Sequence, residues 1–265
     1  MKKVILPCIS ILVVAALHAQ QKEGKIIYQR TAHLQIVTSD GPGEETPVPR
    51  TRIDRFEMNF ANGQMIWKQM EDEMEDENMA MGGGGIMIRT IGGGVDDAVF
   101  CDFEKARRVE AREFFEKKFL VSDSIRRGNW KLSEETKTIL NHLCRKATSQ
   151  RIGKRMMMTM DNGKMERKEL DDTSTVVAWF TTDIPVPVAP ELQGQLPGAI
   201  LEMETNNGRT VYTALEIAPK ADIPAIKEPT KGKKVTPDEF TRERNKMMDE
   251  MEQNNQGGNL RIRVN

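Results

Sequence analysis

TRIDRFEMNFANGQMIWKQM, residues 51–70, carries the pattern that decides the fold. Apolar side chains at Ile53, Phe56, Met58 and Phe60 are separated by polar ones, and a second apolar run follows the dipeptide Asn62-Gly63. Alternation of this kind is typical of a strand with one buried face, and Asn-Gly is the pair that two-residue hairpin turns favour. The stretch therefore predicts two antiparallel strands joined at Asn62-Gly63.

Segments on both sides of this hairpin have the same character. Residues 161–163 (DNG) and 206–208 (NNG) predict two more hairpin tips, whereas residues 133–144 suit either a helical turn or a strand. A succession of strands with short turns favours an antiparallel meander over a parallel sheet. We expect a mainly β fold, a curved meander sheet or half-barrel. Single strands are predicted within residues 24–37, 97–103, 107–123 and 173–186.

The clearest helix signal lies near the C-terminus. Thr236, Pro237 and Glu239 suit the N-cap, the first helical position and the capping-box position. The helix is expected to run for about 16 residues and to precede a glycine-containing tail within the segment 219–265. Its apolar face would be formed by residues at helical spacing: Phe240, Arg244, Met247, Met248 and Met251.

The first twenty residues predict export. Lys2 and Lys3 precede an apolar run from Val4 to Leu17, and Ala19 offers a small residue for cleavage. The run is too short for a permanent membrane helix, and Cys8 lies too early in it for a lipid-accepting cysteine. Residues 1–20 are therefore expected to be a signal peptide, and the mature chain to be periplasmic or outer-membrane-associated with no transmembrane helix.

Composition limits what the mature chain can do. Removal of the leader leaves 39 − 2 = 37 basic against 40 acidic residues, a net charge of −3. This balance excludes the concentrated basic footprint of nucleic-acid binding. Only His33 and His142 remain, which rules out a three-histidine metal site. We expect one β domain at 21–218, interrupted by a Met- and Gly-rich insertion at about 70–97, with no bound cofactor.

The 17 methionines suggest a second interpretation. Thioethers are soft ligands that select Cu(I), although methionine also fills apolar gaps and adaptable partner surfaces. His142, Cys144, Met156 and Met158 are the candidate ligands for such a site. The glycine runs lack the lysine and strand-to-helix context of a phosphate loop, so we interpret them as linkers.

The two cysteines outside the leader allow three arrangements. An even count in an exported chain favours a disulfide between Cys101 and Cys144. Alternatively, His142 and Cys144 would share one face of a strand and could hold a metal or act as a base and nucleophile. The third arrangement leaves both thiols unpaired.

Residues 194–203, GQLPGAILEM, place Pro197-Gly198 before a new apolar alternation. Proline at the second position and glycine at the third are typical of a type II turn, in which the glycine has positive φ. The pair is therefore predicted to turn the chain into a core strand.

Four sequence blocks between Trp130 and Ile217 resemble the GLPGLI family of exported Bacteroidota proteins. Asn141-His142, Gln195 and Ala199 depart from that pattern, so His142 is not a feature shared with the family. The matching residues are Trp130, Lys131, Leu132, Glu135, Lys137, Ile139, Cys144, Lys146, Ala147, Ala178, Trp179, Phe180, Thr181, Ile184, Pro185, Pro190, Leu196, Pro197, Gly198, Ile200 and Leu201.

The resemblance implies an exported, β-rich protein and brings no established activity, ligand or catalytic residue. It also implies an association with outer-membrane uptake, so a TonB-dependent transporter is one expected partner. The sequence thus predicts a non-catalytic envelope protein that binds a partner or a ligand. A copper-handling protein that uses the methionine clusters is the alternative. An enzyme is not predicted, because the carboxylates show no spacing that singles out a pair.

Overall fold

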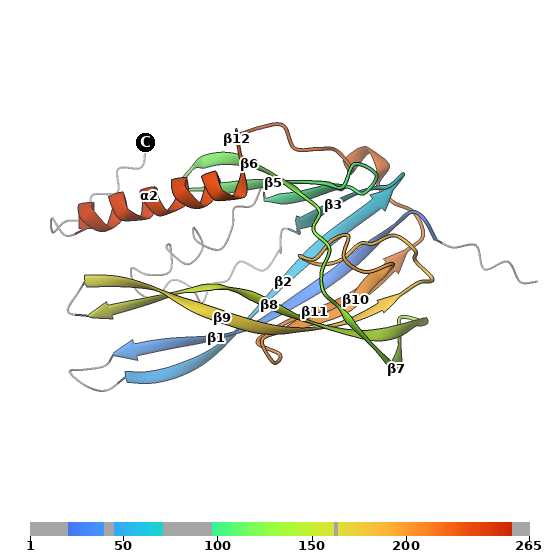
Figure 1. Cartoon of the computed structure of the whole chain (residues 1–265), viewed down its shortest axis with the longest axis horizontal. Helices are drawn as coiled ribbons and strands as arrows, with labels where there is room; N and C mark the ends of the chain where they lie inside the picture. Colours follow the sequence, from blue (N-terminus) through green and yellow to red (C-terminus); the bar gives the residue numbers. More distant parts are fainter. Residues whose placement is uncertain (1–20, 40–44, 71–96, 162–163, 256–265) are drawn as a thin grey trace, which may run out of the picture.

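The computed structural model describes residues 21–39, 45–70, 97–161 and 164–255, and it contains one open sheet (Figure 1). The sheet has twelve strands in the order β12-β6-β5-β4-β3-β2-β1-β11-β10-β9-β8-β7. Neighbouring strands are antiparallel, except that β12 is parallel to β6. The predicted mainly β meander is confirmed, and its one parallel edge was not foreseen.

Two meanders make up the sheet, and the antiparallel pairing of β1 with β11 joins them. The first comprises β1 (Gly24–Ser39), β2 (Glu45–Ala61), β3 (Gln64–Gln69), β4 (Ala98–Asp102), β5 (Arg107–Phe114) and β6 (Lys117–Ser124). The second comprises β7 (Lys131–Ile139), β8 (His142–Asp161), β9 (Lys164–Thr181), β10 (Ala199–Thr205) and β11 (Thr210–Ala218). The short β12 (Lys233–Val235) ends the sheet.

The predicted hairpin tips agree with the strand bounds. Asn62 and Gly63 both have positive φ, 51° and 70°, as a two-residue hairpin turn requires. Residues 206–208 also have positive φ and connect β10 to β11. At the third tip, Asp161 pairs with Lys164 across the hairpin, while residues 162–163 lie outside the described part of the chain.

Two hairpins were not predicted. Residues 107–123, expected to form one strand, form β5 and β6 with a turn at Phe115 and Glu116, which have φ of 47° and 61°. The turn contains no glycine or asparagine, so the sequence carried no turn signal. The ambiguous segment 133–144 is also a hairpin, with its turn at Leu140 and Asn141.

The main core lies between one face of the sheet and the irregular segment 182–198, which connects β9 to β10. Ile184, Val188 and Leu196 of this segment are buried against side chains of the sheet. Tyr28 belongs to the same cluster, and its hydroxyl donates a 2.7 Å hydrogen bond to the Ile200 carbonyl. The segment thus fills the space over the sheet and leaves the main core packed.

A polar network lies at one end of this core. The buried carboxylate of Asp54 accepts hydrogen bonds from Arg30 Nη2 at 2.7 Å and from Arg52 Nε at 2.8 Å. Arg30 also lies over the Phe56 ring, 5.0 Å from its centroid. A buried carboxylate needs such partners. Arg30 and Arg52 supply them, so the core contains no unpaired charge at Asp54.

A second core forms under the helix α2 (Pro237–Asn255). The predicted capping box is present, because Glu239 N donates to Thr236 Oγ1 at 3.3 Å and the Glu239 carboxylate accepts from Thr236 N at 2.8 Å. Phe240 packs on Phe119 of β6 with ring centroids 5.3 Å apart, and Met247 is buried beside them. The helix is 19 residues long, slightly longer than expected.

The segment after β11 returns across the opposite face of the sheet. We call residues 219–232 the strap; it contains the short 3-10 helix η2 (Ile223–Ala225) and leads into β12. Among the described residues, no helix combines the length and the apolarity that a membrane crossing needs. The predicted leader (1–20) and almost all of the Met/Gly-rich insertion (71–96) lie outside the described residues.

Candidate functional site

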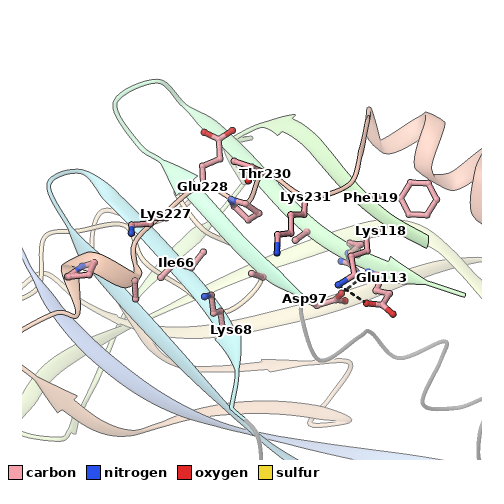
Figure 2. Close-up of a pocket in the computed structure, with 16 residues that line it drawn as sticks. Ile66, Lys68, Asp97, Glu113, Lys118, Phe119, Lys227, Glu228, Thr230 and Lys231 are labelled. Atoms are coloured by element: carbon pink, nitrogen blue, oxygen red, sulfur yellow. Dashed lines mark hydrogen bonds and ion pairs between the residues drawn. The ribbon is translucent and has the colours of Figure 1, made fainter. Parts of the chain in front are cut away.

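A cleft of about 430 Å³ opens between the strap and the face of the sheet opposite the main core (Figure 2). Its lining comes from β3, the start of β4, β5, β6 and the strap, as the close-up shows. Pockets of this size suit a small ligand or a few side chains of a partner. The lining residues are Ile66, Lys68, Asp97, Ala98, Ala111, Arg112, Glu113, Lys118, Phe119, Pro224, Ala225, Lys227, Glu228, Pro229, Thr230 and Lys231.

The floor of the cleft is apolar. Successive strand residues point to opposite faces, so Met65 and Trp67 enter the main core while Ile66 and Lys68 face the cleft. Ile66 and Ala98 belong to a small cluster on this face, against which Ile226 of the strap packs. The strap and the floor are thus joined by apolar contact.

Polar contacts fix the strap at two points. The backbone N–H of Asp222 donates to Asn59 Oδ1 of β2 at 2.9 Å. Further along, Glu228 forms a bidentate ion pair with Arg107 of β5, with one contact at 2.6 Å. Arg107 and these hydrogen bonds hold the pKa of Glu228 below its usual value. The rim of the cleft is therefore defined by contacts within the chain.

The acidic groups of the cleft have partners. Glu228 is bound to Arg107, and Glu113 Oε2 lies 3.6 Å from Lys118 Nζ. Asp97 accepts a 2.8 Å hydrogen bond from the backbone N–H of Glu113. These carboxylates serve to position the strap and the strand ends.

Three lysines of the cleft differ from these acids. Lys68, Lys227 and Lys231 are exposed, and none forms an ion pair with any other described residue. Figure 2 shows Lys68 on the sheet and Lys227 and Lys231 on the strap, so the three lie on both sides of the cleft. An apolar floor between uncompensated ammonium groups is suited to an anionic group that has an apolar neighbour.

The predicted pair His142 and Cys144 lies far from this cleft in the sheet, at the start of β8. His142 Nδ1 is 3.2 Å from Asp183 Oδ2, and Cys144 Sγ is 3.5 Å from the His142 carbonyl oxygen. Burial raises the pKa of the Cys144 thiol to about 11. Cys144 is therefore protonated at neutral pH, which makes it a poor nucleophile.

The four candidate metal ligands do not converge. Met156 and Met158 lie on β8 with His142 and Cys144, but Met156 lies twelve positions after Cys144 along the strand, a distance of roughly 40 Å. Among the described residues, no group of three or more His, Cys, Asp or Glu side chains could hold a metal ion. The geometry therefore gives this set no support.

The predicted disulfide between Cys101 and Cys144 is not formed. Both cysteines are free and buried, and they lie on β4 and β8, seven positions apart in the strand order. Burial also raises the pKa of Cys101, to about 12. The even cysteine count was misleading because each thiol packs as a small apolar side chain in the main core.

The predicted type II turn at Pro197-Gly198 is also wrong. Gly198 is not among the residues with positive φ. Instead, the Cα of Gly198 lies against the chain at the end of β9, where an added Cβ would be 2.9 Å from the Thr181 carbonyl carbon and 3.2 Å from the Ile184 oxygen. Glycine is needed here for a close backbone approach rather than for its dihedral freedom.

Other residues of the family-like blocks contact one another. Trp130 Nε1 donates to Gln195 Oε1 at 3.1 Å, which ties the start of β7 to the segment 182–198. Lys137 Nζ lies 4.4 Å from the Trp179 ring centroid and 2.6 Å from Glu202 Oε1. Lys146 Nζ is 2.9 Å from Glu135 Oε2 and 5.9 Å from the Trp179 ring centroid. These residues hold strands together.

Comparison with known families gives one match. The model of a family described as "Protein of unknown function (Porph_ging)" matches residues 130–202. This region contains β7, β8, β9 and part of β10, whereas every residue that lines the cleft lies outside it. None of the curated protein sequences compared with the chain matches it.

Two solved structures of PNGF-II align with most of this chain. The one titled "Structure of PNGF-II in P21 space group" has a TM-score of 0.50 and 14% identity, and the alignment covers 85% of this chain. A second crystal form, in space group C2, gives a TM-score of 0.49 and 14% identity over 83% of this chain. The chain spans about a third of the length of these proteins, 34% and 32%.

Sequence reasoning did not find the cleft. Its lysines come from positions far apart, Lys68 in β3 and Lys227 and Lys231 in the strap. The only local signal is the segment IKEPTKGKK, 226–234, in which lysines outnumber acids. That signal does not indicate which face of the sheet the strap crosses.

Proposed function

We propose that this chain is a non-catalytic, exported binding protein of the cell envelope, and that its cleft binds an acidic segment of a partner protein. The observation that carries the proposal is the placement of Lys68, Lys227 and Lys231, without acidic partners among the described residues, around an apolar floor. The GLPGLI resemblance and the leader-like start support the exported location. A TonB-dependent transporter is the kind of partner that the resemblance implies.

The packing of the main core favours a protein partner over a ligand carried inside the fold. The segment 182–198 fills the space over the sheet with buried side chains such as Ile184 and Leu196. The cleft, in contrast, lies under an exposed strap on the other face. An open cleft with charges on its rim suits an extended segment that enters from solvent, with carboxylates at the rim and an apolar side chain on the floor.

The chemistry of the described residues favours binding over catalysis. The groups whose pKa is raised by burial are Tyr28, Tyr212, Cys101 and Cys144, and all of them are held in the uncharged form inside the core. In the cleft, Glu228 and Glu113 are engaged with Arg107 and Lys118. A general acid or base in the cleft would need a carboxylate free of such partners.

The test uses a defined acidic probe. A fluorescein-labelled peptide of four Asp-Leu repeats is titrated with the full chain, and binding is followed by fluorescence anisotropy. Replacing Lys68, Lys227 and Lys231 by glutamine is expected to weaken binding by about tenfold, because three partly screened ion pairs are lost. A peptide of four Asn-Leu repeats, which has the same apolar groups without the charges, is expected to bind no better than that variant.

A matched variant controls for overall charge. Lys22, Lys131 and Lys220 are exposed and lie outside the cleft, so their replacement by glutamine changes the net charge equally. This control variant is expected to keep the affinity of the parent chain. An equal loss of affinity in the two variants would mean that peptide binding depends only on net charge, and the proposed site would be wrong.

A further inference from the structure

Two hairpins extend beyond the body of the sheet on the same side of the molecule (Figure 1). In the first, β1 and β2 remain paired out to Ser39 and Glu45, although β11 leaves β1 at the pair Ala32 and Thr210. In the second, β8 and β9 remain paired out to Asp161 and Lys164, although β10 leaves β9 at the pair Thr205 and Val176. We call these extensions the first arm (33–39 with 45–51) and the second arm (149–161 with 164–175).

The inner edge of the first arm offers unpaired backbone groups. His33 N–H donates to the Arg209 carbonyl at 2.8 Å, so the backbone groups of His33 point toward the space between the arms. Alternate residues of a strand point their N–H and C=O to the same side. The backbone N–H and C=O groups of Gln35 and Val37 therefore face that space, where no other described strand pairs with β1. Such an edge is a template for strand addition.

The outer edge of the first arm is different. The Arg55 carbonyl accepts from Met70 N–H at 2.9 Å, so odd-numbered residues of β2 direct their backbone groups away from β1. Two of these outward positions are Pro47 and Pro49, which have no N–H to donate. Proline on an edge strand is a known protection against pairing with other chains. The inner edge, residues 33–39, contains no proline.

We propose that the inner edge of the first arm pairs with the same edge of a second copy of this chain. Antiparallel pairing of β1 with itself places the twofold axis at Ile36, so that Gln35 and Val37 lie opposite Val37 and Gln35 of the second copy. Each such pair exchanges two backbone hydrogen bonds. The interface is closed and self-complementary, as a twofold dimer requires.

The width of the opening fits this occupant. At the body of the sheet, two strands, β11 and β10, separate β1 from β9. Across β11 and β10 the axes of β1 and β9 are about 14 Å apart, and the arms begin where those two strands end. The first arm is itself a two-stranded hairpin. The first arm of a second copy therefore fits between β1 and β9, with its proline-containing edge toward β9.

A cysteine pair tests the register. In this dimer Ile36 lies opposite Ile36 of the second copy in a non-hydrogen-bonded pair, with Cα atoms about 4.5 Å apart, which is within the range of a disulfide. The variant Ile36→Cys is expected to form a disulfide-linked dimer on mild oxidation. The control Leu34→Cys is expected to stay monomeric on a non-reducing gel, because its two copies would be four residues apart, about 13 Å. Equal cross-linking of both variants would overturn the register.

A proline variant tests the pairing itself. Val37 N–H faces the opening, so Val37→Pro removes donors from the dimer ladder without removing one from the β1–β2 ladder. Sedimentation equilibrium is expected to show a dimer for the parent chain and at least a tenfold weaker association for Val37→Pro, with an unchanged circular dichroism spectrum. A monomeric parent chain, or a folded Val37→Pro variant that dimerises normally, would refute the proposal.

Discussion

Two lysines of the region matched by the family model and three lysines of the cleft differ in whether they have acidic partners. In the matched region, Lys137 pairs with Glu202 of β10 and Lys146 pairs with Glu135 of β7, and both lysines lie over Trp179. Around the cleft, Lys68, Lys227 and Lys231 lack such partners among the described residues. Lys137 and Lys146 thus connect elements of the sheet, whereas Lys68, Lys227 and Lys231 are exposed to solvent.

This difference indicates why the signature residues gave no active site. Gly198 allows the chain to approach Thr181, Trp130 binds Gln195, and the buried Cys144 fills the core. Each role is structural, and a structural role in the same sheet suits proteins with different partners. The cleft proposed as the binding site lies in the strap and in the strands beneath it, outside residues 130–202.

The largest change in stability is expected for the substitution Gly198→Ala. The new Cβ would clash with the backbone of Thr181 at the end of β9, and neither chain segment can move without disturbing the main core. We expect a loss of at least about 3 kcal/mol in the free energy of unfolding, measured by urea denaturation. Gly153→Ala is the control, because a Cβ there meets nothing within 4 Å; its stability is expected to change by less than about 0.5 kcal/mol. Similar effects at both glycines would contradict the proposed close approach.

A smaller effect is expected for Trp130→Phe. This substitution removes the indole N–H that donates to Gln195 Oε1 at 3.1 Å and keeps an aromatic ring. The expected cost is about 1 kcal/mol of unfolding free energy, the usual net value of one hydrogen bond, by urea denaturation. Affinity for the acidic probe should not change, because Trp130 does not line the cleft. A loss of affinity without a loss of stability would reverse the assignment of the two regions.

The smallest effect concerns the strap and is pH-dependent. Arg107 lowers the pKa of Glu228 in the folded chain, so this ion pair stabilises the fold above the unfolded pKa of about 4.3. The contribution is lost as the pH falls through the lower folded pKa. Glu228→Gln should therefore be less stable than the parent by a few tenths of a kcal/mol at pH 7. Thermal melts should show the difference disappearing toward pH 3; a constant difference from pH 7 to pH 3 would contradict the ion pair.

Local patterns predicted the fold because they act between residues close in sequence. The hairpin at Asn62-Gly63 and the capping box of Thr236 with Glu239 depend on one turn and one helical turn, respectively. The hairpin at Phe115 and Glu116 was not predicted, because these two residues have a weak turn propensity. Tertiary packing of Phe114 and Phe119 in the second core overrides that propensity. The same holds for Gly198, whose role depends on a contact with Thr181 across the segment 182–198.

The candidate site could not be predicted for a related reason. The cleft forms because the strap crosses the face of the sheet that carries Ile66 and Lys68, and this crossing depends on long-range contacts such as Asp222 with Asn59. Charge patterns in the sequence do not show which lysines will find partners. Nothing in the sequence around Lys137 indicates its partner, and only the register of β7, β8, β9 and β10 brings Glu202 within 2.6 Å of Lys137.

The most direct test compares equal charge changes in the two regions by fluorescence anisotropy with the Asp-Leu probe. One variant combines Lys68→Gln with Lys227→Gln in the cleft, and the other combines Lys137→Gln with Lys146→Gln in the matched region. We predict that the cleft variant binds the probe about fivefold more weakly than the parent chain, through loss of two screened ion pairs, while the other variant binds it with unchanged affinity. An equal loss in both, or a loss confined to Lys137 and Lys146, would contradict the assignment of binding to the cleft.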